Sequence, residues 1–111
     1  MKRAHVALMF ALAWPLAVSA AERGDAPFVV VYRCDGDRWL AVGYPAFRDA
    51  RTARIRLSWQ GRTIELGPIR AGSGARYVNG IAHLEWWSKG HGGTLSSLSP
   101  SRPLLTGCTE A

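Results

Sequence analysis

Hydrophobic residues follow two patterns along this chain: one continuous apolar run near the N-terminus and a series of short alternating stretches after it. The alternation is clearest at 53–59, where Ile55, Leu57 and Trp59 share one face and arginine or serine residues occupy the other. A period of two is that of a β-strand with one buried face. Helical periodicity is almost absent beyond the apolar run, so the pattern predicts a β-protein.

Glycine, proline and aspartate residues separate the alternating stretches and define their ends. We expect strands at 28–34, 38–44, 53–59, 62–66, 75–78, 81–87, 94–98 and 104–108. Gly67–Pro68 should break the hairpin formed by the third and fourth strands, Asn79–Gly80 should form a two-residue hairpin turn, and 90–93 should be a loop. Short strands at this spacing are typical of a small antiparallel β-barrel of about seven to eight strands, because closure leaves no exposed sheet edge. The expected fold class is all-β.

The N-terminal apolar run has the form of a cleavable secretory signal. Lys2 and Arg3 precede it, the run covers 6–18, and small residues follow at 19–21. This order of basic, apolar and small residues is that of a signal peptide, and the run is too short to span a bilayer comfortably. We therefore expect a signal peptide at 1–20, give or take one residue, and a single domain at 21–111. Neither possible new N-terminus is the cysteine that lipid attachment needs, so we expect a soluble periplasmic protein without a stable membrane anchor.

Two cysteines, Cys34 and Cys108, lie near the two ends of the expected domain. In an oxidising compartment such a pair is most simply a disulfide. Closing so long a loop is worth about 4 kcal/mol in the chain-entropy model, which matters for a domain with a small core. Neither cysteine has a partner at metal-ligand spacing, so we expect one disulfide and no metal site.

The chain carries a formal net charge of +6, and +4 remains once Lys2 and Arg3 leave with the signal peptide. The basic residues are spread out and form no nucleic-acid recognition motif, and export also argues against a nucleic-acid partner. An alternative function is a binding module for an anionic glycan or envelope polymer, with an arginine face and Trp86 or Trp87 as an aromatic anchor. The candidate arginines are Arg48, Arg51, Arg54, Arg56 and Arg62. The same arginines would also suit the solvated outer face of a sheet.

The residues that enzymes use do not assemble into a catalytic motif. Ser73 lies between two glycines but lacks the spacing of a nucleophile elbow, and a Ser73–Lys89 dyad would require a desolvated lysine. His83 and His91 are not at metal-ligand spacing. The acidic residues are isolated on strands or placed in a turn, so they offer no pair of catalytic carboxylates. We therefore expect a protein that is not an enzyme and that uses no cofactor.

Lys89 is the only lysine after the expected signal peptide, where eleven arginines occur. Arginine presents a broad planar fork, whereas lysine is a compact point charge on a thin, flexible stem. A narrow acidic slot on a partner would favour the ammonium group. The alternative is that Lys89 is a solvated turn residue after two tryptophans.

Several short motifs carry a family resemblance. Residues 73–77 read SGARY, an Asn79–Gly80 pair and an aromatic strand follow, and 87–90 read WSKG. The domain opens with YRC at 32–34 and closes with Cys108. Over about residues 32–108 the chain resembles the family of membrane-bound and periplasmic inhibitors of c-type lysozyme, MliC/PliC.

The resemblance implies a small antiparallel barrel with a disulfide, and a function as an inhibitor whose protein partner is a c-type lysozyme. It implies that Ser73 and Lys89 enter the catalytic cleft of the enzyme and block its two carboxylates. Further motif residues would complete the contact surface: Gly74, Arg76, Tyr77 and Gly90. The chain differs from the family pattern at two places. The hairpin between the motifs, with His83–Glu85, is about two residues longer, and His91 occurs where an acidic residue is usual.

Overall fold

The computed structural model describes residues 26–111, so the expected signal peptide at 1–20 lies outside the described residues. This part of the chain contains eight strands and a short 3-10 helix at Phe47–Asp49. The strands are β1 (Phe28–Cys34), β2 (Arg38–Tyr44), β3 (Ile55–Trp59), β4 (Arg62–Ile69), β5 (Ala75–Asn79), β6 (Leu84–Lys89), β7 (Gly92–Leu98) and β8 (Ser101–Glu110). Within residues 26–111, no helix is long and apolar enough to cross a membrane.

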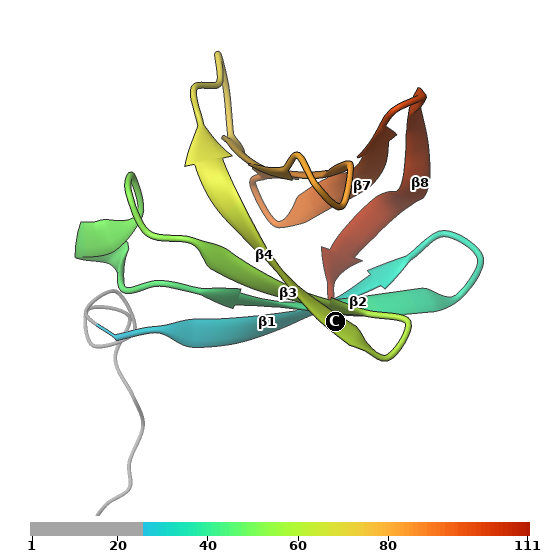
Figure 1. Cartoon of the computed structure of the whole chain (residues 1–111). Coiled ribbons are helices and arrows are strands. Elements are labelled where there is room, and N and C mark those ends of the chain that lie inside the picture. The colour runs from blue at the N-terminus through green and yellow to red at the C-terminus, as the bar shows by residue number, and fades with distance from the viewer. Residues whose placement is uncertain (1–25) are drawn as a thin grey trace, which may run out of the picture.

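The strands follow one another in chain order around a closed barrel, each antiparallel to its neighbours (Figure 1). The last strand closes the sheet, because β8 pairs with β1 through Tyr32↔Glu110 and Arg33↔Thr109. A closed barrel has no free edge at which another chain could add a strand. The predicted all-β antiparallel barrel is confirmed.

The barrel interior is filled by the residues that the alternation assigns to the inner face. Ile55 and Leu57 of β3 are fully buried, and they pair with Leu66 and Ile64 of β4, which are also buried. The largest fully buried side chain belongs to Trp86 of β6. Each large apolar side chain buried in this way contributes roughly 1.5–3 kcal/mol to folding.

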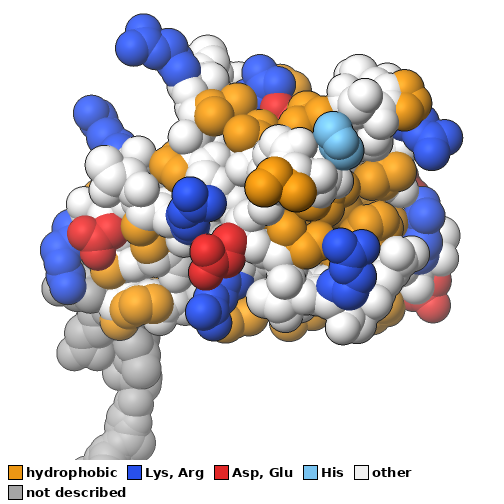
Figure 2. Space-filling model, viewed as in Figure 1, with side chains coloured by type: hydrophobic (Ala, Val, Ile, Leu, Met, Phe, Trp, Pro, Cys, Tyr) orange, Lys and Arg blue, Asp and Glu red, His pale blue; other side chains and the backbone are white. Residues whose placement is uncertain are grey.

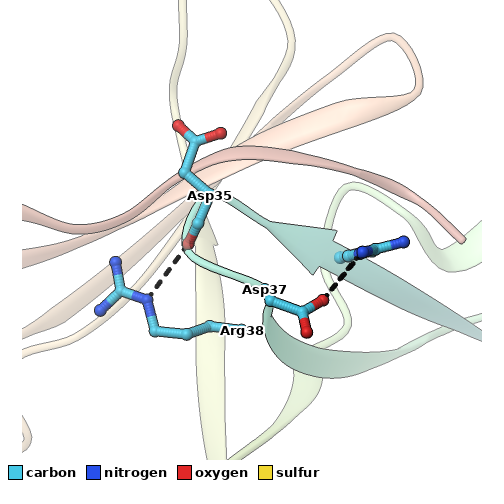
Figure 3. Close-up of polar contacts among 4 residues, drawn as sticks. Asp35, Asp37 and Arg38 are labelled. Atoms are coloured by element: carbon cyan, nitrogen blue, oxygen red, sulfur yellow. Dashed lines mark hydrogen bonds and ion pairs between the residues drawn. The ribbon is translucent and has the colours of Figure 1, made fainter.

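One part of the barrel is fixed by the disulfide between Cys34 of β1 and Cys108 of β8, which confirms the predicted pairing. Hydrogen bonds reinforce this link. The Asp35 backbone N–H donates to the Thr106 carbonyl at 2.9 Å, and Thr106 Oγ1 donates to Asp35 Oδ2 at 3.1 Å. The Arg38 side chain folds back over the β1–β2 turn, where Nε donates to the Asp35 carbonyl at 3.2 Å (Figure 3). The first and last strands are therefore joined by covalent and polar contacts together.

The predicted end of the fourth strand at Leu66 is wrong, because β4 continues to Ile69. The hairpin of β3 and β4 does break at Gly67–Pro68, as predicted. Pairing with β3 stops at Leu66, so the last part of β4 forms no ladder on that side. A proline is tolerated there because its missing N–H removes no ladder hydrogen bond. On its other side β4 pairs with β5, with Pro68 opposite Tyr77.

The Asn79–Gly80 pair does not form the predicted two-residue turn. Asn79 is the last residue of β5 and pairs with Leu84, so residues 80–83 make the connection. The Asn79 side-chain oxygen accepts hydrogen bonds from two backbone N–H groups of this connection, at 2.9 and 2.8 Å. His83, with a φ of 58°, provides the left-handed residue of the turn. Hydrogen bonds to the Asn79 side chain therefore stabilise a longer connection in place of the predicted two-residue turn.

The remaining strand boundaries shift by a few residues. β6 occupies Leu84–Lys89 instead of 81–87. Of the segment His83–Glu85, which the resemblance places in a longer hairpin, only His83 lies in the turn. β7 starts at Gly92, which reduces the predicted loop at 90–93 to a short turn. These shifts place Lys89 at the very end of a strand that is paired on both sides.

Candidate functional site

Two connections of the barrel carry the residues of the SGARY and WSKG motifs. Ser73 and Gly74 lie between β4 and β5, and Lys89 is the last residue of β6. β5 starts directly after the first connection and pairs with β6, with Ala75 opposite Ser88. The register therefore brings Ser73, Gly74 and Lys89 to the same end of two paired strands.

At Gly74 the β4–β5 connection lies close against β6. A Cβ at this position would lie 3.3 Å from Lys89 Cβ and 2.9 Å from Trp87 Nε1, and it would collide with the Ser88 carbonyl oxygen. Its φ of +67° also favours glycine. Gly90 has a φ of +61° but open space around it, so only its backbone conformation favours glycine there.

Trp87 links the two connections. Its Nε1 donates a hydrogen bond to the Ser73 carbonyl at 2.9 Å, and Lys89 Nζ lies 5.7 Å from the centroid of its ring. The Arg76 Cζ lies 5.4 Å from the same ring. Cations at these distances are attracted to the face of an indole ring. We call this group the Trp87 site; its members are Ser73, Gly74, Arg76, Trp87 and Lys89.

Arg76 is held in place by an acidic neighbour. It forms an ion pair with Glu85 of β6, in which Arg76 Nε donates to Glu85 Oε2 at 2.7 Å. The Glu85 side chain is only 11% exposed, so this is a largely shielded pair. Lys89, in contrast, has no acidic side chain within ion-pair distance among residues 26–111, and it is exposed. Lys89 is therefore the available positive charge of the Trp87 site.

Tyr77 lies on the inner face of β5 and is 4% exposed, so it takes no part in the outer surface. Its ring packs edge-on against Tyr44, with the two centroids 6.3 Å apart. Burial, together with the nearby Tyr44, raises the pKa of the Tyr77 phenol. The structure thus brings five of the six motif residues to one surface and places the sixth in the core beneath them.

The core below the Trp87 site is a set of hydrogen-bonded aromatic side chains. Trp86 is fully buried, and its Nε1 donates to the Tyr44 hydroxyl at 2.8 Å, which lies 2.7 Å from the Tyr32 hydroxyl. Burial and the contact with Tyr44 raise the pKa of Tyr32 well above its usual range. Gly93 of β7 makes room for this packing, because a Cβ there would collide with the Trp86 ring. The outer site therefore rests on a densely packed support.

His91, which follows Gly90, contacts an acidic residue of the last strand. Glu110 of β8 places its Oε2 at 3.4 Å from His91 Nδ1, and its backbone N–H donates to the His91 carbonyl at 3.0 Å. The turn that follows Lys89 is therefore fixed to the C-terminal strand.

The five candidate arginines do not all lie together, although Arg54 and Arg56 line a common hollow. Arg62 lies at the β3–β4 turn, whereas Arg48 and Arg51 lie in the β2–β3 connection at the other end of β3. Arg56 is paired with Glu65 at 3.7 Å. Figure 2 shows basic side chains dispersed over the visible face without a single continuous patch.

Tryptophan placement agrees with strand alternation. Trp86 is fully buried and Trp87 is 37% exposed, so of these two residues only Trp87 can contact a partner. The sequence left open which of the two tryptophans could act as an anchor and treated Glu85 as one of the isolated acidic residues on strands. The β5–β6 register is the signal that could have linked these residues. Because Arg76 pairs with Trp87, the side chains of Arg76, Glu85 and Trp87 all lie on the outer face.

The described residues offer no arrangement for metal chemistry, since no group of three or more His, Cys, Asp or Glu side chains in 26–111 could hold an ion. Ser73 and Lys89 are both exposed, which is not the environment of a desolvated catalytic lysine. Both side chains are therefore accessible to a partner.

Comparison with known proteins identifies relatives of this chain. A family model described as the membrane-bound lysozyme-inhibitor of c-type lysozyme matches residues 32–99, a range that contains every member of the Trp87 site. A Cupriavidus necator protein named membrane-bound lysozyme inhibitor of C-type lysozyme is 37% identical over 82 residues. That alignment covers 71% of this chain and 62% of the relative, so the chain spans less than two thirds of the relative's length. No solved structure matches.

Proposed function

The chain belongs to the family of membrane-bound lysozyme inhibitors of c-type lysozyme, and from this premise we propose that it inhibits a c-type lysozyme. We propose further that the Trp87 site enters the catalytic cleft of the enzyme, with Lys89 and Ser73 as the residues that reach its carboxylates. The observation that carries this proposal is that one side chain, Trp87, contacts both motif connections. The protein then acts by occupying a site and performs no reaction of its own.

The charge of Lys89 explains how binding in the catalytic cleft would inhibit the lysozyme. Lysozyme uses two carboxyl groups, one kept protonated as the general acid and one ionised. An ammonium group placed beside them favours the ionised form of the acid and removes the proton that the reaction needs. The same side chain fills space that a sugar ring would occupy. Lys89 suits this role because it is exposed and has no acidic partner among residues 26–111.

The neighbouring residues hold Lys89 and Ser73 ready for binding. The Ser73 carbonyl is fixed by Trp87, Gly74 lies directly against Lys89, and both connections adjoin paired strands. Less conformational freedom is then lost when the complex forms, which strengthens binding. The Ser73 hydroxyl is free to donate a hydrogen bond to a carboxylate of the enzyme.

Replacing Lys89 tests the proposal directly. Lys89→Ala should weaken inhibition of a c-type lysozyme at least about tenfold, because truncating a buried charged contact costs about 2–5 kcal/mol. Lys89→Arg should recover only part of the inhibition, since the planar guanidinium is broader than an ammonium. The measurement is the inhibition constant with cell-wall substrate. Arg62→Ala is the matched control, because it removes one exposed positive charge at the β3–β4 turn. Unchanged inhibition by Lys89→Ala would reject this role for Lys89.

We infer a location in the cell envelope, where an inhibitor of this kind would meet lysozyme. The relative is named as membrane-bound, whereas the leader of this chain predicts export without lipid attachment. Fractionation of cells that express the full chain distinguishes a soluble periplasmic protein from an anchored one.

A further inference from the structure

A basic pocket of about 620 Å³ lies beside the Trp87 site. The end of β4, the start of β5 and the β2–β3 connection form its walls, and Gly74 and Arg76 belong to both the pocket and the Trp87 site. Arg51 and Arg70 also line the pocket. Three guanidinium-bearing residues from three different segments thus surround one hollow that adjoins the Trp87 site.

The pocket keeps a net positive charge. Glu85 compensates the charge of Arg76, but Arg51 and Arg70 form no ion pair with any acidic side chain in 26–111. Asp49 belongs to the same connection as Arg51 but does not line the pocket. Both unpaired arginines are exposed, so they are available to an incoming group.

The walls around these arginines favour a carboxylate. Apolar residues such as Pro68 and Ile69 line the pocket together with the guanidinium groups. Electrostatic attraction in the pocket strengthens once a partner has displaced water from it. A guanidinium fork also matches the two oxygens of a carboxylate in geometry and charge.

Arg51 is placed on an ordered segment. Successive backbone hydrogen bonds stabilise the β2–β3 connection, from the Asp49 N–H to the Ala46 carbonyl at 2.8 Å and from the Ala53 N–H to the Asp49 carbonyl at 2.9 Å. Ala46 is itself buried, which attaches the connection to the barrel. The pocket is therefore formed before a partner arrives, and binding there needs little reordering of the backbone.

We propose that this pocket receives an acidic side chain on the rim of the inhibited enzyme's cleft, which makes Arg51 and Arg70 specificity-determining residues. This inference rests on the proposed function, because the pocket adjoins the surface that would enter the cleft. Its consequence is that the protein discriminates among c-type lysozymes by the charge next to their cleft. A lysozyme with acidic rim residues gains an ion pair, whereas one with basic rim residues is repelled.

The test compares two double variants of the full chain that lose the same charge. Arg51→Gln/Arg70→Gln removes the unpaired charges of the pocket. Arg62→Gln/Arg102→Gln removes the same number of charges elsewhere, one at the start of β4 and one near the start of β8. Inhibition constants are measured against two c-type lysozymes, one with acidic and one with neutral or basic residues around the cleft. We expect the pocket variant to lose about tenfold against the acidic enzyme and the control variant to lose no more than about threefold. Arg51→Lys/Arg70→Lys should recover part of the loss.

Each other outcome would overturn the inference in a different way. Equal losses in both double variants would mean that only long-range electrostatic attraction matters. A rise in ionic strength would then abolish the difference between the variants and the wild type. Unchanged inhibition in the pocket variant, with a loss in Lys89→Ala, would remove the pocket's role and leave the proposed function intact. If the wild-type chain inhibits neither lysozyme, both proposals fail. If the pocket variant only loses retention on purified peptidoglycan sacculi, the pocket binds an anionic glycan instead.

Discussion

The two faces of β6 differ in almost every property, although their residues alternate along one six-residue strand. The inner face carries Leu84 and Trp86, both buried in the barrel core. The outer face carries Trp87 and Lys89, which are exposed, with Glu85 shielded beneath Arg76. Inside, the contacts are apolar packing and a hydroxyl network; outside, they are ion pairs and cations over one indole ring.

This contrast shows how a small barrel separates stability from recognition. Trp86 and Trp87 are adjacent and chemically identical, yet their environments give them different roles. The energy of folding comes mainly from side chains that lose all contact with water. A binding surface needs the opposite, namely groups that remain exposed until a partner covers them. One strand serves both purposes because successive side chains point to opposite faces.

The largest expected effect is the loss of stability on removal of the inner tryptophan, Trp86. Trp86→Ala should lower the free energy of unfolding by about 4 kcal/mol, since it empties a large volume in a closed core and removes the hydrogen bond donor to Tyr44. Urea denaturation measures the loss. If the variant is unfolded in buffer, Trp86→Phe, which leaves a smaller cavity, gives the same comparison. A loss below about 1 kcal/mol for both variants would contradict the assignment of Trp86 to the stabilising core.

Removal of the outer tryptophan, Trp87, should instead weaken inhibition and change the stability little. Trp87→Ala should weaken lysozyme inhibition about tenfold, because both Ser73 and Lys89 lose the ring that positions them. Its effect on the free energy of unfolding should stay below about 1.5 kcal/mol, since the side chain is partly exposed. Trp87→Phe keeps an aromatic face but loses the hydrogen bond to Ser73, so intermediate inhibition is expected. If Trp87→Ala unfolds as easily as Trp86→Ala, the separation of the two faces does not hold.

The smallest expected effect concerns pH and reports on the barrel interior. The pKa of Tyr32 is raised in the folded state, so the phenol ionises more easily in the unfolded chain, at about pH 10. Its stabilising contribution is complete below that pH and is lost progressively as the pH rises toward the folded-state pKa. Near pH 10.5 the loss from Tyr32 should be about 1 kcal/mol. Tyr77, whose pKa is also raised, adds to it.

Denaturation at several alkaline pH values measures this effect, with Tyr32→Phe as the control. The variant lacks the titrating phenol, so its stability should fall less steeply between pH 9 and 10.5. Identical slopes for wild type and variant would show that Tyr32 is not the group responsible.

Much of the fold was predictable because it depends on local alternation. The inner positions of β3 and the pairing of Cys34 with Cys108 were predicted correctly, since a period of two and an even cysteine count require no knowledge of distant contacts. The end of the fourth strand and the Asn79–Gly80 turn were misjudged for one common reason. Whether a proline breaks a strand depends on which side has a partner, and whether an asparagine forms a turn depends on where its side chain bonds.

The sequence by itself determined the fold class, the disulfide and the residue types of the two motifs, because composition and spacing are sufficient for these. Only the tertiary structure decided that Trp87 joins Ser73 to Lys89, that Glu85 pairs with Arg76 and that Tyr77 lies inside. These contacts depend on the register of β5 with β6, where a slip of one residue would reverse every side chain. The basic pocket depends on still longer-range packing, because Arg51 and Arg70 reach it from connections that are separated by two strands.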